Sequence, residues 1–216
     1  GSAGPGCASR ITEPFEAEQT AQAEDAQVVM QAEQTAQAKD AQAEQTAQAE
    51  DAQVGAAGPE LVQALASLLT RVAAQGGRPQ RMTPFHAVRV PHMSVHDYLT
   101  RISTYFKCSK ECFVLGLMYM DRVVNNHRPE FTICSLNIHR LLVTSIVLAA
   151  KFYDDIYYSN TFYAKVAGLR TKELNALEAL LLKKLGWQLH VQPREYEQYR
   201  LHMMLVNGGA VQSPQD

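Results

Sequence analysis

The stretch that decides the fold is Leu141-Leu142-Val143-Thr144-Ser145-Ile146-Val147-Leu148-Ala149-Ala150-Lys151-Phe152. Its residues predict a helix that is apolar on nearly every side, which a soluble protein tolerates only at the centre of a bundle. Lys151 follows just as the buried run ends. Because an unpaired ammonium group in a dry site is costly, we expect Lys151 to have a partner on a neighbouring helix.

The composition excludes two broad classes of partner. The 216 residues are 46% hydrophobic and 19% charged, which suits one ordinary domain with additional sequence. The formal net charge of -2 gives no general attraction to nucleic acid or to anionic lipid. Uninterrupted apolar runs are shorter than the roughly 18–20 residues that a membrane span needs. We therefore expect neither nucleic acid nor a membrane as a partner.

The four cysteines, Cys7, Cys108, Cys112 and Cys134, have neither the spacing of a disulfide framework nor a CxxC motif. Cys108 and Cys112 could share a helix face, but nothing nearby supplies the other ligands of a closed zinc site. We interpret the cysteines as small buried thiols in a reducing compartment. No secretory signal is recognised ahead of the domain, so we expect an intracellular protein of the nucleus, the cytoplasm or both.

Residues 1–58 differ in kind from the rest of the chain. An 11-residue unit occupies residues 17–27 and recurs at 32–42, with Lys39 in place of a glutamate, and at 43–53. Its alanine, glutamine and glutamate favour a helix, but it has no leucine, isoleucine or aromatic residue that a helix would bury. We predict a disordered or frayed helical leader, with a self-associating coil as the alternative.

From Pro59 onward apolar residues recur at helical spacing, and no stretch alternates convincingly as a strand. A helix at 59–75 is followed by a proline-containing linker to residue 90. Five helices are then predicted, with Ser94, Asn160 and Thr171 as N-caps. Their expected bounds are Ser94 to Phe106, about Ser109 to Asn125, Thr132 to about Tyr153, Asn160 to Gly168, and Thr171 to Gly186. A further helix from Pro193 to about Val206 and a disordered tail at 207–216 complete an all-α bundle.

Four charged residues lie where the pattern predicts a buried or half-buried face. Glu178 falls among the leucines of the helix at 171–186, Asp121 lies on the apolar face of the helix before residue 126, and Arg101 lies at the edge of its helix's apolar face. With Lys151 they give two charges of each sign, which suggests the pairs Lys151–Glu178 and Arg101–Asp121. The alternative is that each charge reaches water at the rim of the bundle.

Several motifs, taken together and in order, resemble those of cyclins, and among these the P/U-type (Pho-like) cyclins. The matching segments are SVHDYLTRI at 94–102, YMDR at 119–122, SLNIHRLL at 135–142, LAAKF at 148–152, YYSN at 157–160, YAKVAG at 163–168 and ELNALE at 173–178. The resemblance covers about residues 90–190. It implies a single five-helix cyclin box within residues 91–206, together with a C-terminal helix and flanked by the helix at 59–75, and an origin in a protozoan or fungus-like lineage.

The resemblance also implies a site. It makes Lys151 and Glu178 the lysine–glutamate pair at the kinase contact, and Arg101 and Asp121 an internal ion pair. The apolar positions that cyclins press against the C helix of the kinase correspond to Leu148, Phe152, Trp187 and Leu189. At the patch where many cell-cycle cyclins carry Met-Arg-Ala-Ile-Leu, this chain has LTRIS at residues 99–103, with no tryptophan nearby.

The function implied is that of a non-catalytic regulatory subunit that binds and activates a cyclin-dependent protein kinase, without cofactor, metal or small-molecule ligand. The alternative is a cyclin-fold adaptor that binds transcription machinery or another protein. Catalysis by the chain itself is not expected, because it has neither a phosphate-binding glycine-rich loop nor a GxSxG motif. His92 and His96 are four residues apart, but a cap at Ser94 leaves His92 outside the helix.

Overall fold

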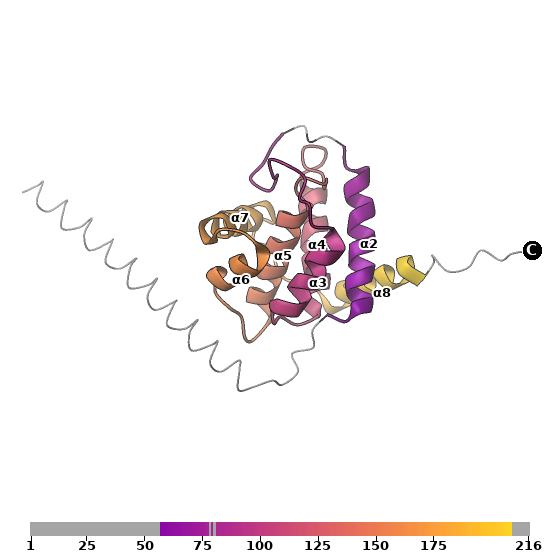
Figure 1. Ribbon diagram of the computed structural model, residues 1–216. Coiled ribbons are helices and arrows are strands. Elements are labelled where there is room, and N and C mark those ends of the chain that lie inside the picture. Colours follow the sequence, from indigo (N-terminus) through magenta and orange to yellow (C-terminus); the bar gives the residue numbers. More distant parts are fainter. Residues whose placement is uncertain (1–56, 78, 80, 209–216) are drawn as a thin grey trace, which may run out of the picture. The chain divides into compact units, whose positions relative to one another are not determined.

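The computed structural model describes residues 57–77, 79 and 81–208, so the predictions for the repeats and for the tail beyond residue 208 lie outside the described residues. Within these ranges all regular secondary structure is helical, as predicted (Figure 1). The helices are α2 (Pro59–Gln75), α3 (Val95–Tyr105), α4 (Glu111–Asn126), α5 (Ile138–Tyr153), α6 (Asn160–Ala167), α7 (Thr171–Lys184) and α8 (Pro193–Gly208). None of these helices is long and apolar enough to cross a membrane.

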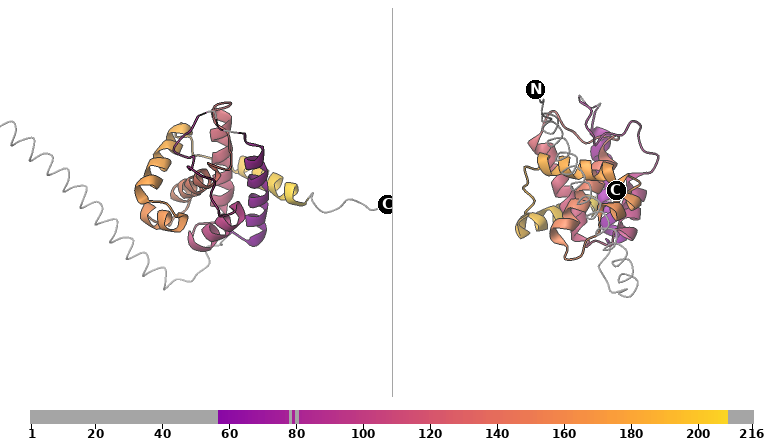
Figure 2. Two further views of the ribbon diagram at one scale, coloured as in Figure 1. Left: turned by 45° about the horizontal axis from the view of Figure 1, so that its top comes forward. Right: turned by 90° about the vertical axis from the view of Figure 1, so that its left-hand side faces the viewer.

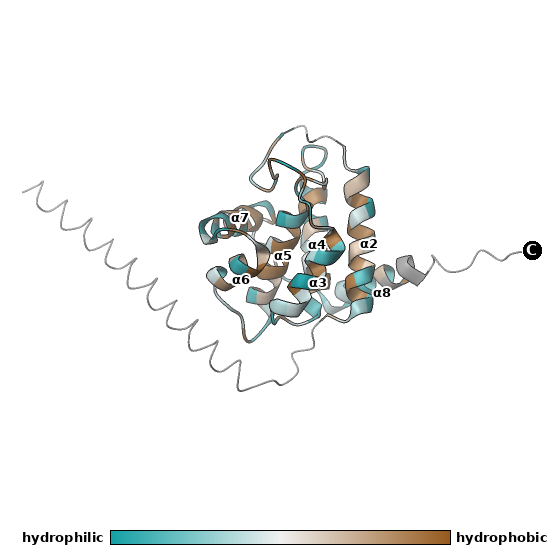
Figure 3. Cartoon of the chain, in the orientation of Figure 1, coloured by the Kyte–Doolittle hydropathy of each residue, from teal (hydrophilic) through white to brown (hydrophobic). Residues whose placement is uncertain are grey.

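Helix α5 lies at the centre of the bundle, as its sequence predicts. Every residue from 141 to 150 is buried, and the most extensive contact between two helices joins α5 to α4. A Cβ atom at Gly116 of α4 would lie only 3.0 Å from Cγ1 of Ile146, so a glycine here permits this close approach. In Figure 3 α5 is coloured mostly hydrophobic, whereas hydrophobic and hydrophilic colours alternate along α2 and α7.

The remaining helices surround α4 and α5 in two groups. Helices α2 and α8 contact each other on one side, and α6 and α7 contact each other on the other side, as both views agree (Figures 1 and 2). Helix α3 packs against α2, α5 and α6. Helices α3 to α7 are therefore the five-helix bundle, with α2 and α8 as the flanking helices. This arrangement brings the C-terminal end of α5 beside α7.

The start of α5 differs from the prediction by six residues, since the helix begins at Ile138 and not at Thr132. The buried side chain of Asn137 explains the difference. Its oxygen accepts from the backbone N–H of Cys134 (2.8 Å), and its nitrogen donates to the carbonyl of Thr132 (2.8 Å). These bonds hold residues 132–137 in a turn, because a local side-chain bond to the backbone competes with helix formation.

One of the three predicted N-caps is confirmed. The Ser94 hydroxyl accepts from the third residue of α3 at 3.0 Å. Helix α6 is capped instead by Ser159, which leaves the side chain of Asn160 available for other contacts. Thr171 is the first residue of α7, and Arg170 is the N-cap residue without a side-chain capping bond. Both errors are of one residue, and at α6 the reason is that the neighbouring Ser159 is itself a favoured capping residue.

Candidate functional site

Lys151 and Glu178 form the predicted ion pair between α5 and α7. The Lys151 Nζ donates to Glu178 Oε1 at 2.7 Å and to Oε2 at 3.0 Å. Its third contact is with Oδ1 of Asn160 at 3.2 Å. A lysine ammonium has three N–H donors, so all of them are used. The charge at the end of the buried run is therefore fully satisfied within the chain.

Asn160 is a member of this cluster that sequence reasoning treated only as a helix cap. Its side-chain nitrogen donates to Glu178 Oε2 at 2.7 Å and to Oδ1 of Asn175 at 2.7 Å. Asn160 thus contacts both partners of the ion pair and fixes their relative position. Its place in the YYSN motif, directly after a serine able to cap the helix, was the available signal. We call Lys151, Asn160, Asn175 and Glu178 the polar cluster.

The polar cluster is partly buried but remains accessible. The side chain of Lys151 is 28% exposed and that of Glu178 is 14% exposed. At this depth the attraction between the charges is stronger than at a fully solvated surface, where ion pairs contribute little. The cluster is therefore both a defined contact between α5 and α7 and a feature that another molecule can reach.

Large exposed apolar side chains lie near the residues of the polar cluster in the sequence. Phe152 follows Lys151 directly, Ile156 and Tyr157 lie in the loop that leads to Asn160, and Trp187 follows α7; they are 49%, 65%, 55% and 72% exposed. The Tyr153 hydroxyl donates to the carbonyl of Leu189 at 3.2 Å and so attaches the segment after α7 to the end of α5. We call Phe152, Ile156, Tyr157 and Trp187 the apolar rim. Exposed apolar groups gathered around a polar centre are typical of protein interaction surfaces.

Trp187 is held outward by the backbone. Gly186 and Trp187 both adopt left-handed conformations, with φ values of +59° and +63°. A tryptophan in this region costs about 1 kcal/mol or more, because its Cβ crowds the following carbonyl. The indole is 72% exposed, so packing of the ring in the core does not explain why Trp187 adopts this unfavourable backbone conformation.

Leu148 and Leu189 are placed differently from Phe152 and Trp187. Their side chains are 4% and 8% exposed and belong to the core. They support the backbone beneath the rim and have little surface to present to a partner. Of the four apolar positions that the resemblance implies, Phe152 and Trp187 are therefore exposed, and Leu148 and Leu189 are internal.

The predicted Arg101–Asp121 pair is not formed in the structure. Asp121 instead accepts from the Asn125 side chain at 2.9 Å and from the hydroxyl of Tyr199 on α8. Burial and the bond to Asp121 raise the pKa of Tyr199, so the hydroxyl keeps its proton and acts as the donor. In the described part of the chain no ion pair includes Arg101, since α3 packs against α2, α5 and α6 while Asp121 faces α8.

Arg122, the neighbour of Asp121 in the YMDR motif, joins α4 to the segment after α7. Its guanidinium forms a salt bridge with Glu195 of α8 at 2.9 Å. It also donates to the carbonyls of Gln188 and His190 at 3.2 and 3.1 Å. Arg122 therefore fixes the segment that begins just after Trp187, as well as α8.

The cysteines within the described ranges are buried free thiols, as predicted: Cys108, Cys112 and Cys134. Cys7 lies outside them. The Cys112 thiol donates to Oδ2 of Asp154 at 3.3 Å. The hydrogen bond with Cys108 and then burial raise the pKa of Cys112, so the thiol stays protonated. Among the described residues no group of three or more histidine, cysteine, aspartate or glutamate side chains is placed to hold a metal ion.

Comparison with known proteins identifies the family of the chain. The sequence model of the cyclin family matches residues 9–189, which includes the N-terminal repeats as well as the bundle. The chain belongs to the cyclin family. Cyclins are non-catalytic regulatory proteins, so this cyclin is a regulatory protein and not an enzyme.

The relatives of this cyclin include U-type and P-type cyclins of plants. Cyclin-U4-1 of Arabidopsis thaliana is 43% identical over 147 residues, which cover 65% of this chain and 72% of the relative. Cyclin-U1-1 of the same plant is 38% identical over 156 residues, which cover 68% and 74%. Cyclin-P3-1 of Oryza sativa subsp. japonica is 45% identical over 121 residues, which cover 56% and 50%. These plant relatives support the P/U type and give no support to a protozoan or fungus-like lineage.

Proposed function

We propose that this cyclin binds a cyclin-dependent protein kinase through the polar cluster and the apolar rim, and that binding activates the kinase. The observation that carries the proposal is the Lys151–Glu178 pair at 2.7 Å, which is partly exposed and is followed directly in the chain by the exposed Phe152. Membership of the family supports the class of partner. The match of Lys151, Glu178, Phe152 and Trp187 to the family's kinase-contact positions supports the choice of surface.

The hydrogen-bonding state of the cluster sets what a partner must offer. The three donors of Lys151 are already used. The Glu178 carboxylate accepts three hydrogen bonds, whereas a carboxylate has about four acceptor positions. The Glu178 carboxylate can therefore accept a further hydrogen bond from a partner. Suitable donors are backbone N–H groups or basic side chains at the end of a helix. Phe152 and Trp187 supply the apolar area beside it, in the manner of interface anchors.

Activation follows if the surface binds one position of the kinase C helix better than the others. A kinase aligns ATP only when its lysine pairs with the glutamate of that helix. Moving the helix from about 1:99 to 99:1 in favour of the active position needs roughly 5.5 kcal/mol of differential binding. A buried aromatic anchor and a few desolvated hydrogen bonds are each worth about 2 kcal/mol or more at an interface, so a surface of this composition is sufficient.

A location in the nucleus or cytoplasm is part of the proposal. The three buried cysteines of the described residues are free thiols. Free thiols fit a reducing compartment, where disulfides do not persist. Microscopy of the tagged chain checks the location, and export from the cell would contradict it.

The test is to purify the tagged, full-length chain from its own cells and to identify the bound kinase. Lys151→Ala combined with Glu178→Ala should lower the amount of kinase captured by about 30-fold or more. The phosphorylation of a serine/threonine peptide by the captured material should fall by the same factor. Asn160→Ala keeps both charges but removes the group that positions them, so a smaller loss is expected.

The control is Glu197→Ala combined with Arg200→Ala, which removes an exposed ion pair of 3.0 Å on α8 and leaves the net charge unchanged. Circular dichroism establishes that each variant is folded. Undiminished kinase capture by a folded Lys151→Ala, Glu178→Ala variant would rule out this surface. Association with transcription machinery and no kinase would favour the adaptor alternative.

A further inference from the structure

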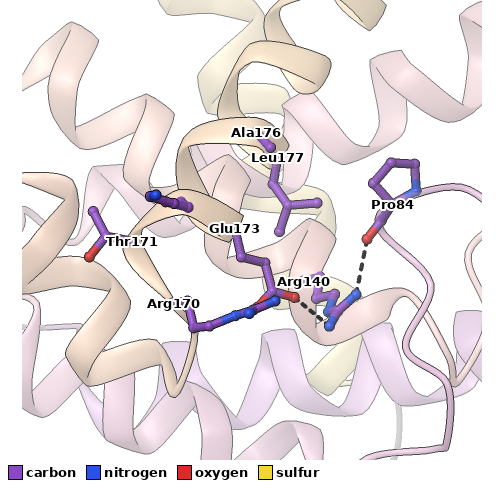
Figure 4. Close-up of a pocket in the computed structure, with 8 residues that line it drawn as sticks. Pro84, Arg140, Arg170, Thr171, Glu173, Ala176 and Leu177 are labelled. Carbon is purple, nitrogen blue, oxygen red and sulfur yellow. Dashed lines mark hydrogen bonds and ion pairs between the residues drawn. The ribbon is translucent and has the colours of Figure 1, made fainter. Parts of the chain in front are cut away.

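A second site lies at the start of α7. A cavity of about 590 Å³ is lined by the first turns of α7, by Arg140 of α5 and by Pro84 of the linker before α3. Figure 4 shows the side chains of Arg140, Arg170 and Glu173 converging at its edge. The volume is within the range of about 300–1,000 Å³ that is usual for ligand sites.

Much of the cavity lies on the opposite flank of α7 from the polar cluster. Glu173, Ala176 and Leu177 line the cavity, whereas Asn175 and Glu178 belong to the polar cluster. With about 100° between successive residues of a helix, these two sets point to opposite sides of the α7 axis. Thr171, which also lines the cavity, shares the face of Glu178 but lies about 10 Å away from it along the axis. A ligand in the cavity therefore leaves the surface proposed for the kinase uncovered.

The cavity holds an excess of positive charge. Arg140, Arg170 and Lys172 are cations, and Glu173 is the carboxylate that lines it. The chain as a whole has a formal net charge of -2, so the local sign is opposite to the overall one. Within the described ranges no hydrogen bond or ion pair engages the side chains of Arg170 and Lys172.

Arg140 is held in place and still has donors to spare. Its guanidinium donates to the carbonyls of Pro84 and His86 at 3.0 and 3.2 Å and forms a salt bridge with Glu173. A guanidinium has five N–H donors, and these contacts use three of them. Its side chain is 28% exposed. The guanidinium of Arg140 is thus fixed in place with two free N–H donors, and such paired donors suit the oxygens of a phosphate group.

We propose that this cavity binds a phosphorylated serine or threonine in a protein segment. A phosphate monoester carries about -1.5 to -2 charges at neutral pH, which matches the local excess of two positive charges, whereas a carboxylate carries half as much. The N-terminal end of α7 adds donors, but the three cations carry the recognition. Pro84 and Ala176 provide an apolar wall for the segment itself.

The source of this ligand rests on the proposed function, because a protein kinase produces phosphoserine and phosphothreonine. A segment phosphorylated once would remain attached to the cyclin at α7 while the kinase acts on another residue of the same protein. The cavity would then favour repeated phosphorylation of one substrate.

The binding step is tested on the full-length chain alone, without a kinase. Fluorescence anisotropy measures binding of a labelled peptide of glycine and alanine around one phosphoserine. Arg170→Ala combined with Lys172→Ala should weaken binding by about 10- to 100-fold, the loss expected for charged hydrogen bonds. Both residues are exposed, so the fold should be unaffected. The matched control, Lys165→Ala with Lys183→Ala, removes two other exposed cations and should leave binding unchanged.

Three results would overturn the proposal. Equal binding of the unphosphorylated or aspartate-substituted peptide would show that the phosphate is not recognised. Equal affinity for inorganic phosphate would make free phosphate the ligand. Full affinity in the folded Arg170→Ala, Lys172→Ala variant would place the site elsewhere. The Lys151→Ala, Glu178→Ala variant should bind the phosphopeptide normally, so failure of the kinase proposal and failure of this one are distinguishable.

Discussion

The polar cluster between α5 and α7 and the surroundings of Asp121 on α4 make an informative contrast. In both places the sequence puts a charged residue on a helix face that is otherwise apolar, and in both an opposite charge was available on another helix. At the first the expected ion pair forms at 2.7 Å. At the second the aspartate binds Asn125 and Tyr199.

The contrast arises from which helices are neighbours. Helices α5 and α7 contact each other, so Lys151 and Glu178 face a shared boundary. Asp121 faces α8, a helix outside the five-helix bundle, which brings a tyrosine hydroxyl. A buried or half-buried charge needs a hydrogen-bonding partner, but that partner need not be an opposite charge.

The largest effect on stability should follow Glu178→Ala. The substitution leaves the ammonium of Lys151 partly buried with Asn160 as its remaining partner, so the free energy of unfolding should fall by about 2 kcal/mol. Urea denaturation followed by circular dichroism measures the change. Lys151→Ala added to Glu178→Ala should cost less than the sum of the single changes. If the free energy of unfolding falls by less than about 0.5 kcal/mol, the Lys151–Glu178 pair contributes no more than an ordinary exposed ion pair, contrary to this prediction.

Tyr199→Phe should have the next largest effect. The change removes the hydroxyl that donates to Asp121 and retains the ring, so the free energy of unfolding should fall by about 1 kcal/mol. Tyr196→Phe is the matched control on the same helix, because no hydrogen bond of the Tyr196 hydroxyl is present among the described residues. Equal losses in the two variants would contradict the role assigned to Tyr199.

The smallest effect is expected for the coupling between Arg101 and Asp121. In a double-mutant cycle of Arg101→Ala and Asp121→Ala, the two changes should add to within about 0.5 kcal/mol, as for residues that share no contact. The same unfolding measurement serves here, with the cycle of Lys151→Ala and Glu178→Ala as the positive comparison. A coupling near 2 kcal/mol would restore the ion pair that the family resemblance implied.

Much of the fold was accessible from local patterns. The bounds of α2 and the all-α class follow from apolar spacing. The start of α5 did not, because the turn at 132–137 depends on the buried side chain of Asn137 bonding to the backbone on both sides. Within the site, Lys151 and Glu178 were predicted together. Asn160 was missed as a member, since a single polar residue at a helix start gives no sign of its distant contacts.

The sequence of residues 141–152 determines that α5 is central and that Lys151 needs a partner, because an apolar helix must be enclosed and a charge must be satisfied. The packing of the helices decides the rest. It selects Glu178 and Asn160 for Lys151 and gives Asp121 to Tyr199, and it turns Trp187 outward and Leu189 inward. It also gathers three cations in the cavity at α7. Spacing along the chain specifies which face of a helix is buried, but only the positions of the neighbouring helices specify what that face meets.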